Sequence, residues 1–357
     1  MDSSIMVLAV PVFMILILVE FYASFRNKTD RYNLNDSLNN ISTGIVEEIA
    51  ALPMKIVILV VYHYLYLHYG YWQLDGSTWI SWFVAWIGVD FCYYWFHRCS
   101  HRCAFLWIGH SVHHQSTYYN LSVALRQGVV QAMTSWVFFL PLAMLGVSPI
   151  VFGIMYTFNT IYQFWIHTQS IQQLGWLEKV FNTPSHHRVH HGTNPQYIDK
   201  NYAGSLIIWD KLFGTFEPED EAVTYGVTDP LDSWNPFYAN IKVIKDVLFY
   251  SHYLPTWHEK ILAFIMPPEW VVNAAGRANS TIYKPLHSPN LKTISTLKQI
   301  SLTVLAIGLY FILMTQYQTN LVVCTAALLP LLGTLYWQGK IADGNKGPLV
   351  IIPSSIA

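Results

Sequence analysis

Long apolar stretches constrain the fold of this chain more than any other feature. A membrane-spanning helix needs about 20 mainly apolar residues, and seven stretches of the sequence meet that need. They are residues 5–25, 45–69, 78–96, 128–146, 149–167, 298–315 and 319–337. Only 11% of the residues are charged, against about 25% in soluble globular proteins. The sequence therefore predicts an all-α integral membrane protein, folded as a multi-pass helical bundle.

The borders of two stretches give further expectations. The fourth and fifth stretches are separated only by residues 146–149, whose sequence Gly-Val-Ser-Pro predicts a tight helical hairpin. The first stretch has no basic residue before it and no clear small-residue cleavage site. We therefore expect a retained membrane helix there, rather than a secretory signal peptide that is removed.

Basic residues after the first stretch predict the orientation. Arg26, Lys28 and Arg31 mark the cytoplasmic side. Alternate crossings then bring His97, after the third stretch, and His167, at the end of the fifth, to that same side. We expect the histidine-rich site to face the cytoplasm. The membrane would be that of the endoplasmic reticulum in a eukaryote, or the inner membrane in a bacterium.

The pattern divides the chain into four parts. We expect N-terminal membrane helices over 1–75, a histidine-rich catalytic domain over 76–240, a cytoplasmic or interfacial segment over 241–297, and a C-terminal membrane hairpin with its tail over 298–357. The polar residues 168–297 are expected to form a cap of helices and loops that rests on the membrane.

Among 15 histidines, the first cluster is His97 and His101, which continue from the third apolar stretch. Positions i and i+4 of a helix lie on one face, so both imidazoles can reach one site. Asp90 lies on about the same stripe. A carboxylate near a ligating histidine often accepts its second N–H, so we expect Asp90 to support this pair.

The second and third clusters share the pattern H-x-x-H-H. They are His110, His113 and His114, and then His187, His190 and His191, with His186 one turn before His190. Adjacent residues of a helix point about 100° apart. Each doublet can therefore supply two neighbouring metals rather than chelate one.

His167 stands alone at the end of the fifth stretch, with Gln163 one turn before it to support its ring. A lone histidine is usually an interfacial or hydrogen-bonded residue, which is our interpretation of His63, His68, His252, His258 and His287. The clusters are different, because desolvating so many imidazoles without a metal would be costly. The predicted metal-site residues are His97, His101, His110, His113, His114, His167, His186, His187, His190 and His191.

The residue types narrow the choice of metal. The 4 cysteines form no C-x-x-C pair, and the histidines outnumber the ligands that one tetrahedral zinc needs. Imidazole suits iron, copper, nickel and zinc alike. We favour two irons, because apolar substrates in membranes commonly require O2 chemistry. The net charge of −1 gives no support to a nucleic-acid partner.

These motifs resemble the fatty acid hydroxylase / sterol desaturase superfamily of integral membrane di-iron enzymes. Within it, the chain is most similar to the alkylglycerol monooxygenase (glyceryl-ether monooxygenase) family, over roughly residues 30–230. The supporting stretches are Asn39–Gly44 (NNISTG), Tyr94–His101 (YWFHRCSH), Tyr119–Gln127 (YNLSVALRQ), Tyr162–Thr168 (YQFWIHT), Asn182–Gly192 (NTPSHHRVHHG) and Ile198–Glu217 (IDKNYAGSLIIWDKLFGTFE). The chain departs from that family at Arg102, where an acidic residue often follows the first histidine box.

The resemblance implies a reaction and its cofactors. O2 and tetrahydrobiopterin would hydroxylate the carbon next to an ether oxygen of a membrane lipid, and the product would fall apart into a fatty aldehyde and glycerol. It also implies that the clustered histidines hold two irons, that His167 and His186 complete or support the site, and that no catalytic residue is needed beyond the metal site. Arg126, Asp199, Lys200 and Asn201 lie in matching motifs. They would bind a headgroup, orient a pterin or form structural salt bridges.

Other readings stay open at this stage. A sterol or fatty-acyl hydroxylase or desaturase has the same metal core, since hydroxylation and desaturation begin with the same hydrogen abstraction. A histidine-lined metal transporter is more distant, because transporters place their ligands near the bilayer midplane. The sequence leaves open the lipid, the electron donor and the oligomeric state.

Overall fold

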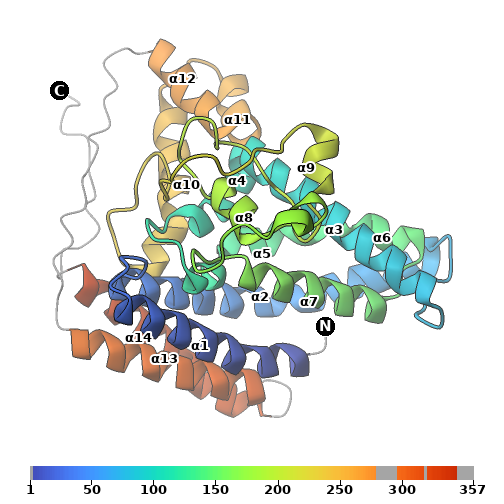
Figure 1. The fold of residues 1–357 in the computed structure, drawn as a ribbon, viewed down its shortest axis with the longest axis horizontal. Coiled ribbons are helices and arrows are strands. Elements are labelled where there is room, and N and C mark those ends of the chain that lie inside the picture. Colours follow the sequence, from blue (N-terminus) through green and yellow to red (C-terminus); the bar gives the residue numbers. More distant parts are fainter. Residues whose placement is uncertain (1–2, 279–295, 317–319, 344–357) are drawn as a thin grey trace.

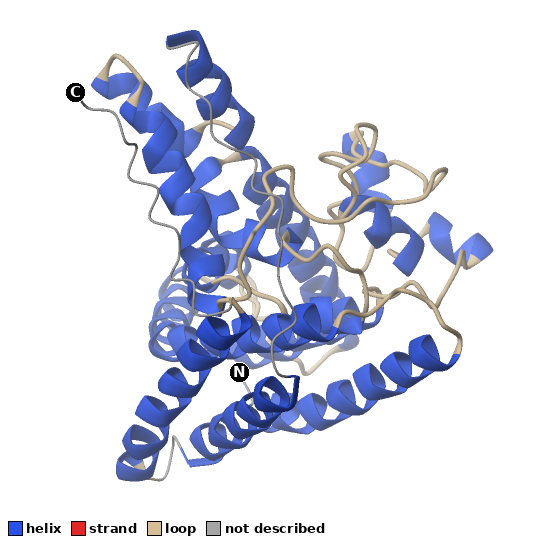
Figure 2. Cartoon of the chain, turned by 90° about the vertical axis from the view of Figure 1, so that its left-hand side faces the viewer, coloured by secondary structure: helices blue, strands red, loops and turns tan. Residues whose placement is uncertain are grey.

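The computed structural model describes residues 3–278, 296–316 and 320–343, and these ranges fold into helices joined by loops (Figures 1 and 2). The α-helices are α1 Ser3–Arg26, α2 Leu34–Tyr69, α3 Trp79–Arg102, α4 Ala104–His114, α5 Val129–Thr134, α6 Leu140–Leu145, α7 Pro149–Trp165, α8 Pro184–His190, α9 Ile208–Phe213, α10 Pro236–His252, α11 Trp257–Ile265, α12 Pro268–Ala278, α13 Thr296–Gln316 and α14 Leu321–Ala342. Three short 3-10 helices are η1 Leu121–Leu125, η2 Ser135–Phe139 and η3 Gly175–Lys179. Within the described ranges the only β pairing is three isolated bridges, so the predicted all-helical fold is confirmed.

Long helices form one layer of the molecule. In Figure 1, α1, α2, α7, α13 and α14 lie side by side across the lower half. The pair α13 and α14 packs on α2 through a shared apolar core that includes Ile41, Ile45, Leu331 and Leu335. The short helices α4 and α8 lie above this layer, and α10 to α12 form a group at the upper left.

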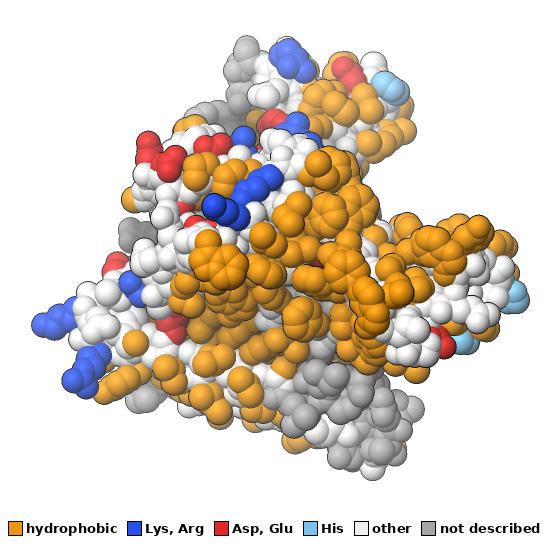
Figure 3. Space-filling model, turned by 45° about the vertical axis from the view of Figure 1, so that its right-hand side comes forward, with side chains coloured by type: hydrophobic (Ala, Val, Ile, Leu, Met, Phe, Trp, Pro, Cys, Tyr) orange, Lys and Arg blue, Asp and Glu red, His pale blue; other side chains and the backbone are white. Residues whose placement is uncertain are grey.

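Three described helices are long and apolar enough to cross a membrane: Ala9–Arg26, Lys298–Thr315 and Val322–Ala342. They correspond to the first, sixth and seventh predicted stretches, apart from residue 319, which lies outside the described ranges. Figure 3 shows a broad hydrophobic surface over the middle and right of one face, with Lys and Arg mainly at its left and upper margins. These features fit a membrane protein.

Residues 128–146 are helical over Val129–Leu145, but this apolar helix is shorter than the three candidate membrane spans. They form α5, η2 and α6 in succession. Pro141 has no N–H to bond the carbonyl of Val137, and proline is tolerated only in the first turn of a helix. Pro141 lies in the first turn of α6, so a new helix begins there.

The second, third and fifth predicted stretches are helical but are not among the three candidate spans. They fall in α2, α3 and α7. Helix α2 carries Glu47, Glu48 and Lys55 among its apolar residues, and α7 has 17 residues. Helix α7 is thus shorter than the about 20 residues that a membrane span needs.

The predicted turn at residues 146–149 is present between α6 and α7. Gly146 has a φ of +100°, and a Cβ there would lie 1.8 Å from the carbonyl oxygen of Trp72. Only glycine fits both conditions. Pro149 then begins α7, and the Ser148 side chain accepts a hydrogen bond from the backbone N–H of Val151.

The predicted polar segment is helical in part. Residues 236–278 form α10, α11 and α12, which share an apolar core with Ala104 at the start of α4. Residues 279–295, with His287, and the tail 344–357 lie outside the described ranges.

Candidate metal centre

Nine histidines form two groups, and the ring nitrogens of each group could together hold a metal ion. One ring nitrogen from every member lies within 4.8 Å of those of the other members, and all nine residues are buried. The five-histidine group is His97, His101, His110, His114 and His190. The four-histidine group is His113, His167, His187 and His191.

Helical spacing explains how three elements supply eight of these side chains. Helix α3 carries His97 and His101 one turn apart, near its end. Helix α4 carries the second cluster in its last turn and a half, and the short helix α8 carries the third. Because positions i, i+3 and i+4 share a helical face, each helix end directs its imidazoles into one space.

The five-histidine group is tightly packed. The Nε2 atoms of His97 and His110 are 2.8 Å apart, and those of His110 and His114 are 3.1 Å apart. The Nε2 of His190 lies 3.1 Å from that of His114. His101 joins the group from α3, with its ring centroid 4.9 Å from that of His190.

The four-histidine group lies directly beside it. The Nε2 of His167 is 3.1 Å from that of His113 and 3.0 Å from that of His187. The ring of His191 stacks on that of His114, with centroids 4.3 Å apart and planes 25° apart. The two groups therefore share one continuous cluster of rings.

The electrostatics of the cluster favour neutral rings. Burial lowers the pKa of His113 to about 4 and lowers the pKa of His114, His190 and His191 well below the ordinary value. Neutral imidazole is the form that binds metals. The cluster is thus in the correct protonation state for coordination near neutral pH.

Unpartnered ring nitrogens also fit a metal. The Nε2 atoms of His101 and His191 are buried and have no hydrogen-bond partner among the described residues. An unpartnered buried polar atom costs free energy, and a metal ion would remove that cost. The donor set, all imidazole nitrogens, suits iron, zinc, copper or nickel.

A loop after α8 supports the five-histidine group. The Nδ1 atoms of His97 and His190 lie 2.8 Å and 2.9 Å from the carbonyl oxygens of Tyr202 and Lys200. When Nδ1 carries the proton it donates to the carbonyl and leaves Nε2 free to bind.

The same loop also contacts His101 of the five-histidine group, and two of its residues have unusual backbone angles. Asp199 lies 3.4 Å from Nδ1 of His101 and also pairs with Arg102 at 2.5 Å. Asp199 and Asn201 adopt positive φ values of 60° and 54°, a region that non-glycine residues rarely occupy outside constrained sites.

Two further rings, those of His110 and His113, are oriented from other elements. Nδ1 of His110 lies 2.7 Å from Oε1 of Gln131. Helix α5 approaches closely at this point, because a Cβ at Gly109 would lie 2.3 Å from the backbone nitrogen of Gln131. Nδ1 of His113 lies 2.9 Å from the carbonyl oxygen of Arg126.

The predicted supporting role of Gln163 is present in a different form. Nδ1 of His167 lies 2.7 Å from the backbone carbonyl oxygen of Gln163. The side-chain amide of Gln163 instead donates to Asn159. The main chain of α7 therefore orients the histidine.

Asp90 is fully buried but supports the site less directly than predicted. Its carboxylate accepts hydrogen bonds from Ser205, Leu206, Trp209 and Asn159. The expected bond from a histidine is not among these contacts. Asp90 fixes the loop that carries the carbonyl groups opposite His97 and His190.

Arg126 is buried, and its guanidinium donates hydrogen bonds to four acceptors of the protein. It donates to the carbonyl of Val112 at 2.6 Å, to Gln115 at 2.7 Å and to Asn40 at 3.1 Å, and it also bonds Asn39. These contacts place Arg126 behind His113. The predicted role in headgroup or pterin binding stays a prediction.

Lys200 and Asn201 were predicted beside Arg126 and Asp199 as substrate or cofactor residues. Lys200 contributes its carbonyl to His190, and its ammonium lies 3.6 Å from Glu217. Asn201 donates to the carbonyls of His186 and Glu217. Their polar groups hold the loop and the end of α8 together.

His186 belongs to neither group. Its ring packs near Phe216, with centroids 5.4 Å apart, and burial lowers its pKa to about 4. His63, His68, His252 and His258 also lie outside both groups, as expected from the sequence.

Sequence reasoning missed four residues that support the centre. Gln131 orients His110, and Tyr119 donates its hydroxyl to Ile166 and packs on His167. Glu20 and Arg188 bind the segment that follows His167. Glu20 had a readable signal, because a lone carboxylate inside an apolar span needs polar partners.

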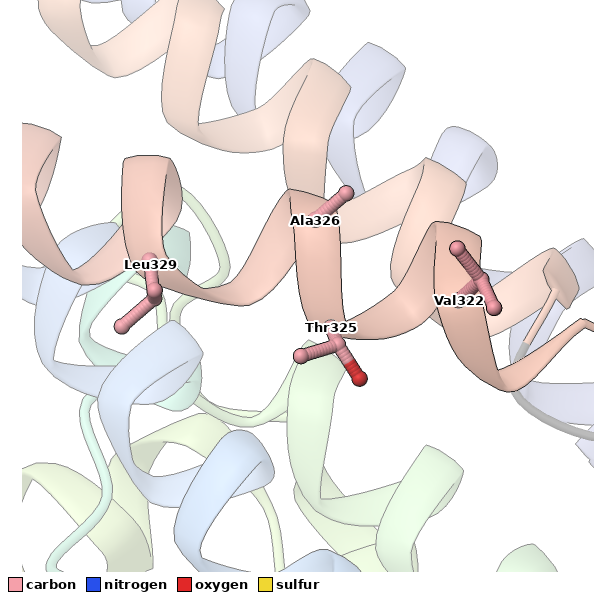
Figure 4. A pocket seen from close by; sticks show the side chains of 4 residues that line it. All are labelled: Val322, Thr325, Ala326 and Leu329. Atoms are coloured by element: carbon pink, nitrogen blue, oxygen red, sulfur yellow. The ribbon is translucent and has the colours of Figure 1, made fainter.

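The surface pocket of Figure 4 is separate from this centre. Val322, Thr325, Ala326 and Leu329 line it, all from one side of α14. Its lining is an apolar helix face without any histidine. This pocket therefore has no part in the candidate metal centre, which the buried histidines form.

Comparison with known proteins agrees with this chemistry. Residues 82–215 match the fatty acid hydroxylase family. The chain is 49% identical over 228 residues to alkylglycerol monooxygenase of Danio rerio, covering 63% of this chain and 51% of the relative. It is 44% identical over 263 residues to alkylglycerol monooxygenase of Homo sapiens, covering 73% and 59%.

A more distant relative is a bacterial lipid hydroxylase. Ornithine lipid hydroxylase OlsE of Rhizobium tropici is 27% identical over 226 residues, covering 58% of this chain and 65% of that protein. The chain spans somewhat more than half of the length of the alkylglycerol monooxygenases it matches. No solved structure matches it.

Proposed function

We propose, from the premise that residues 82–215 form a fatty acid hydroxylase domain, that this chain is a membrane-bound non-haem di-iron monooxygenase. Its substrate would be a lipid, and its reaction the O2-dependent hydroxylation of a C–H bond. The most specific form of the proposal is cleavage of an alkylglycerol ether to a fatty aldehyde, since relatives at 42–49% identity carry the name alkylglycerol monooxygenase.

One observation carries the proposal: two buried groups of five and four imidazoles lie side by side. A closed structural zinc site uses four ligands, so the larger group exceeds that need. Two neighbouring groups that lack a carboxylate ligand favour two metals of the same kind. O2 activation requires a redox metal, and imidazole is a suitable ligand for iron.

The distances between ring nitrogens are short enough for neighbouring rings to bind one metal ion. For metal–nitrogen bonds of about 2.1 Å, neighbouring ligands lie about 3.0 Å apart in an octahedral site and about 3.4 Å apart in a tetrahedral one. The Nε2 pairs His97–His110, His110–His114 and His114–His190 are 2.8, 3.1 and 3.1 Å apart. These values are close to the spacing of ligands around one metal ion.

When bound, the two irons would supply the reduction of O2 and the oxidation of the C–H bond. The overall reaction takes one O2, two electrons and two protons, places one oxygen atom on the carbon next to the ether and releases the other as water. A tetrahydrobiopterin of the kind the family resemblance implies would provide the two electrons. The hydroxylated carbon then carries two oxygens, and loss of glycerol leaves the fatty aldehyde.

The chain's own residues position and protect this chemistry. Carbonyls of Lys200 and Tyr202 and the amide of Gln131 fix three rings with Nε2 toward the site. All nine imidazoles are buried, which excludes water from the reacting region. The broad apolar surface in Figure 3 is of the kind that lipid chains contact.

The proposal also includes the membrane topology of the chain. The apolar helices α1, α13 and α14 would cross the membrane, and we propose a multi-pass protein whose histidine centre faces the cytoplasm. Arg26, the last residue of α1, and Lys28, two residues later, favour a cytoplasmic position for that end. The membrane would be the endoplasmic reticulum in a eukaryote or the inner membrane in a bacterium.

A second candidate is hydroxylation of another lipid without ether cleavage. The similarity to ornithine lipid hydroxylase OlsE favours it, and a sterol or fatty-acyl hydroxylase or desaturase would use the same centre. The difference lies in which carbon the site presents to the oxidant.

Product analysis separates these candidates. Purified protein in detergent, loaded with Fe2+, is given an alkylglycerol, a sterol or an acyl lipid, each with and without tetrahydrobiopterin. The proposal expects fatty aldehyde from the alkylglycerol, only with the pterin. Oxidation of an acyl lipid or sterol, without aldehyde from the ether and without need for pterin, would replace it with the second candidate.

A further inference from the structure

We infer that Glu20, a buried carboxylate of the apolar helix α1, is a positioning residue for the metal site of the four-histidine group. It acts through the segment that carries His167. The inference rests on the proposed two-metal centre and extends it to a helix outside the matched domain of residues 82–215.

Glu20 lies inside the candidate membrane span Ala9–Arg26 and is only 7% exposed. A buried carboxylate without partners is strongly unfavourable in an apolar surrounding. This one has four donors. Its Oε2 accepts from the hydroxyl of Tyr32 at 2.6 Å and from the backbone N–H of Leu121 at 2.9 Å. Its Oε1 accepts from Thr168 and, at 3.0 Å, from Ser170.

Three of these donors, Leu121, Thr168 and Ser170, belong to two segments that contact each other at His167. Thr168 directly follows the histidine, and Leu121 lies two residues after Tyr119. The Tyr119 hydroxyl donates to the carbonyl of Ile166 at 3.0 Å, and its ring packs on that of His167, with centroids 5.8 Å apart. The Glu20 carboxylate therefore holds two segments in place. One contains His167, and the other contains Tyr119, whose ring packs against His167.

His167 needs such support more than the other eight ligands. Helix α7 ends at Trp165, so His167 lies in a turn, whereas the others lie on a helix or at its final cap. Only the carbonyl of Gln163 contacts its Nδ1 among the described residues. If the segment around His167 were free to move, the ring could leave its position. There its Nε2 lies 3.1 Å from that of His113 and 3.0 Å from that of His187.

Helix α1 is itself held against this region. The ring of Phe13 stacks on that of Phe164, with centroids 3.9 Å apart and planes 13° apart. Phe13 and Ile17 share an apolar core with Leu121 and Phe164. This packing brings Glu20 to the end of α7 and keeps its charge away from the lipid.

The test is iron binding to the metal-free full chain in detergent, compared between wild type and Glu20→Gln. The amide has about the same size but carries no charge, and it offers only one acceptor oxygen to four donors. We expect two irons per chain in the wild type. In Glu20→Gln we expect one iron to bind unchanged and the other about 10–100-fold more weakly, the range for lost support of a metal ligand.

Glu48→Gln is the matched control. Glu48 is another carboxylate of a long helix, and it pairs with Lys55 at 2.6 Å. The Glu48→Gln protein should bind both irons with the affinity of the wild type. Selective weakening of one iron in Glu20→Gln distinguishes positioning from general damage to the fold, which would weaken both. Unchanged binding of both irons to Glu20→Gln would overturn the inference.

A second pair of variants tests the inference if the Glu20→Gln protein does not fold. Thr168→Val removes the donor beside His167, whereas Tyr32→Phe removes a donor to the same carboxylate far from the histidine in the chain. We expect Thr168→Val to weaken one iron and Tyr32→Phe to weaken neither. Equal, wild-type binding by both would overturn the inference. If the wild type itself binds fewer than two irons, the proposed two-metal centre fails instead.

Discussion

His113 and His114 are neighbours in the chain but belong to different metal groups. Their ring planes are 86° apart, and their centroids are 5.4 Å apart. The doublet His190 and His191 repeats the arrangement, with planes 90° apart. Each H-x-x-H-H motif thus gives one ring of its doublet to each group, as the helical period of the sequence predicted.

This split predicts separate effects for the two members of a doublet. His190→Ala should lose the iron of the five-histidine group, and His191→Ala should lose the iron of the four-histidine group. Each variant should retain about one iron per chain and lose lipid oxidation by at least about 100-fold, because both metals are needed. Metal analysis of the purified variants checks it. Two irons retained in either variant would contradict the assignment.

The amide of Gln131 orients His110, and its loss should weaken metal binding. Gln131→Leu keeps the volume but removes the acceptor 2.7 Å from Nδ1 of His110. We expect about 10–100-fold weaker iron binding. Gln73→Leu, at an exposed glutamine in the loop between α2 and α3, is the control. The two variants would be compared by titration of Fe2+ into metal-free protein, and equal affinities would refute the role of Gln131.

Asp90 should matter for stability more than for metal affinity. Asp90→Asn replaces one carboxylate oxygen with an amide that meets donors such as the N–H groups of Ser205 and Leu206. We expect a loss of about 1–3 kcal/mol, the cost of an unsatisfied buried group. Thermal unfolding in detergent measures it, with exposed Asp75→Asn as the control. A midpoint shift no larger than that of the control would contradict this expectation.

The metal-free protein should be less stable in mild acid. Burial lowers the pKa of His113 and His186 to about 4, below the ordinary value of about 6.5. Unfolded histidines therefore take up protons between pH 6.5 and 4 while the folded ones do not. Stability present above pH 6.5 should fall by about 1.4 kcal/mol per pH unit for each such group.

Thermal unfolding of chelator-treated protein between pH 7.5 and 5.0 tests this linkage. The unfolding midpoint should decrease steadily as the pH falls. A midpoint that stays constant over this range would show that the histidines are charged or solvated in the folded chain.

The sequence indicated which histidines come together because helical spacing is local. His97 and His101 lie one turn apart, and H-x-x-H-H places three rings on one helix end. His186 has the same local signal but belongs to neither group. Its ring packs near Phe216, which only the folded arrangement reveals.

The supporting residues were harder to predict, because backbone groups and long-range contacts leave no pattern. The rings of His97 and His190 depend on carbonyls of Tyr202 and Lys200, and every residue type has a carbonyl. Glu20 lies 148 residues from Thr168 in the chain. Pro141 was a readable signal for the change of helix type within the fourth predicted stretch.

Isotope analysis of the fatty aldehyde tests the central proposal most directly. Iron-loaded protein is given an alkylglycerol and tetrahydrobiopterin under 18O2, and borohydride traps the aldehyde as an alcohol before its oxygen exchanges with water. We expect one 18O atom in the trapped fatty alcohol, because the hydroxyl oxygen becomes the aldehyde oxygen. Fatty alcohol that carries only water-derived oxygen, or no product from the ether, would contradict it.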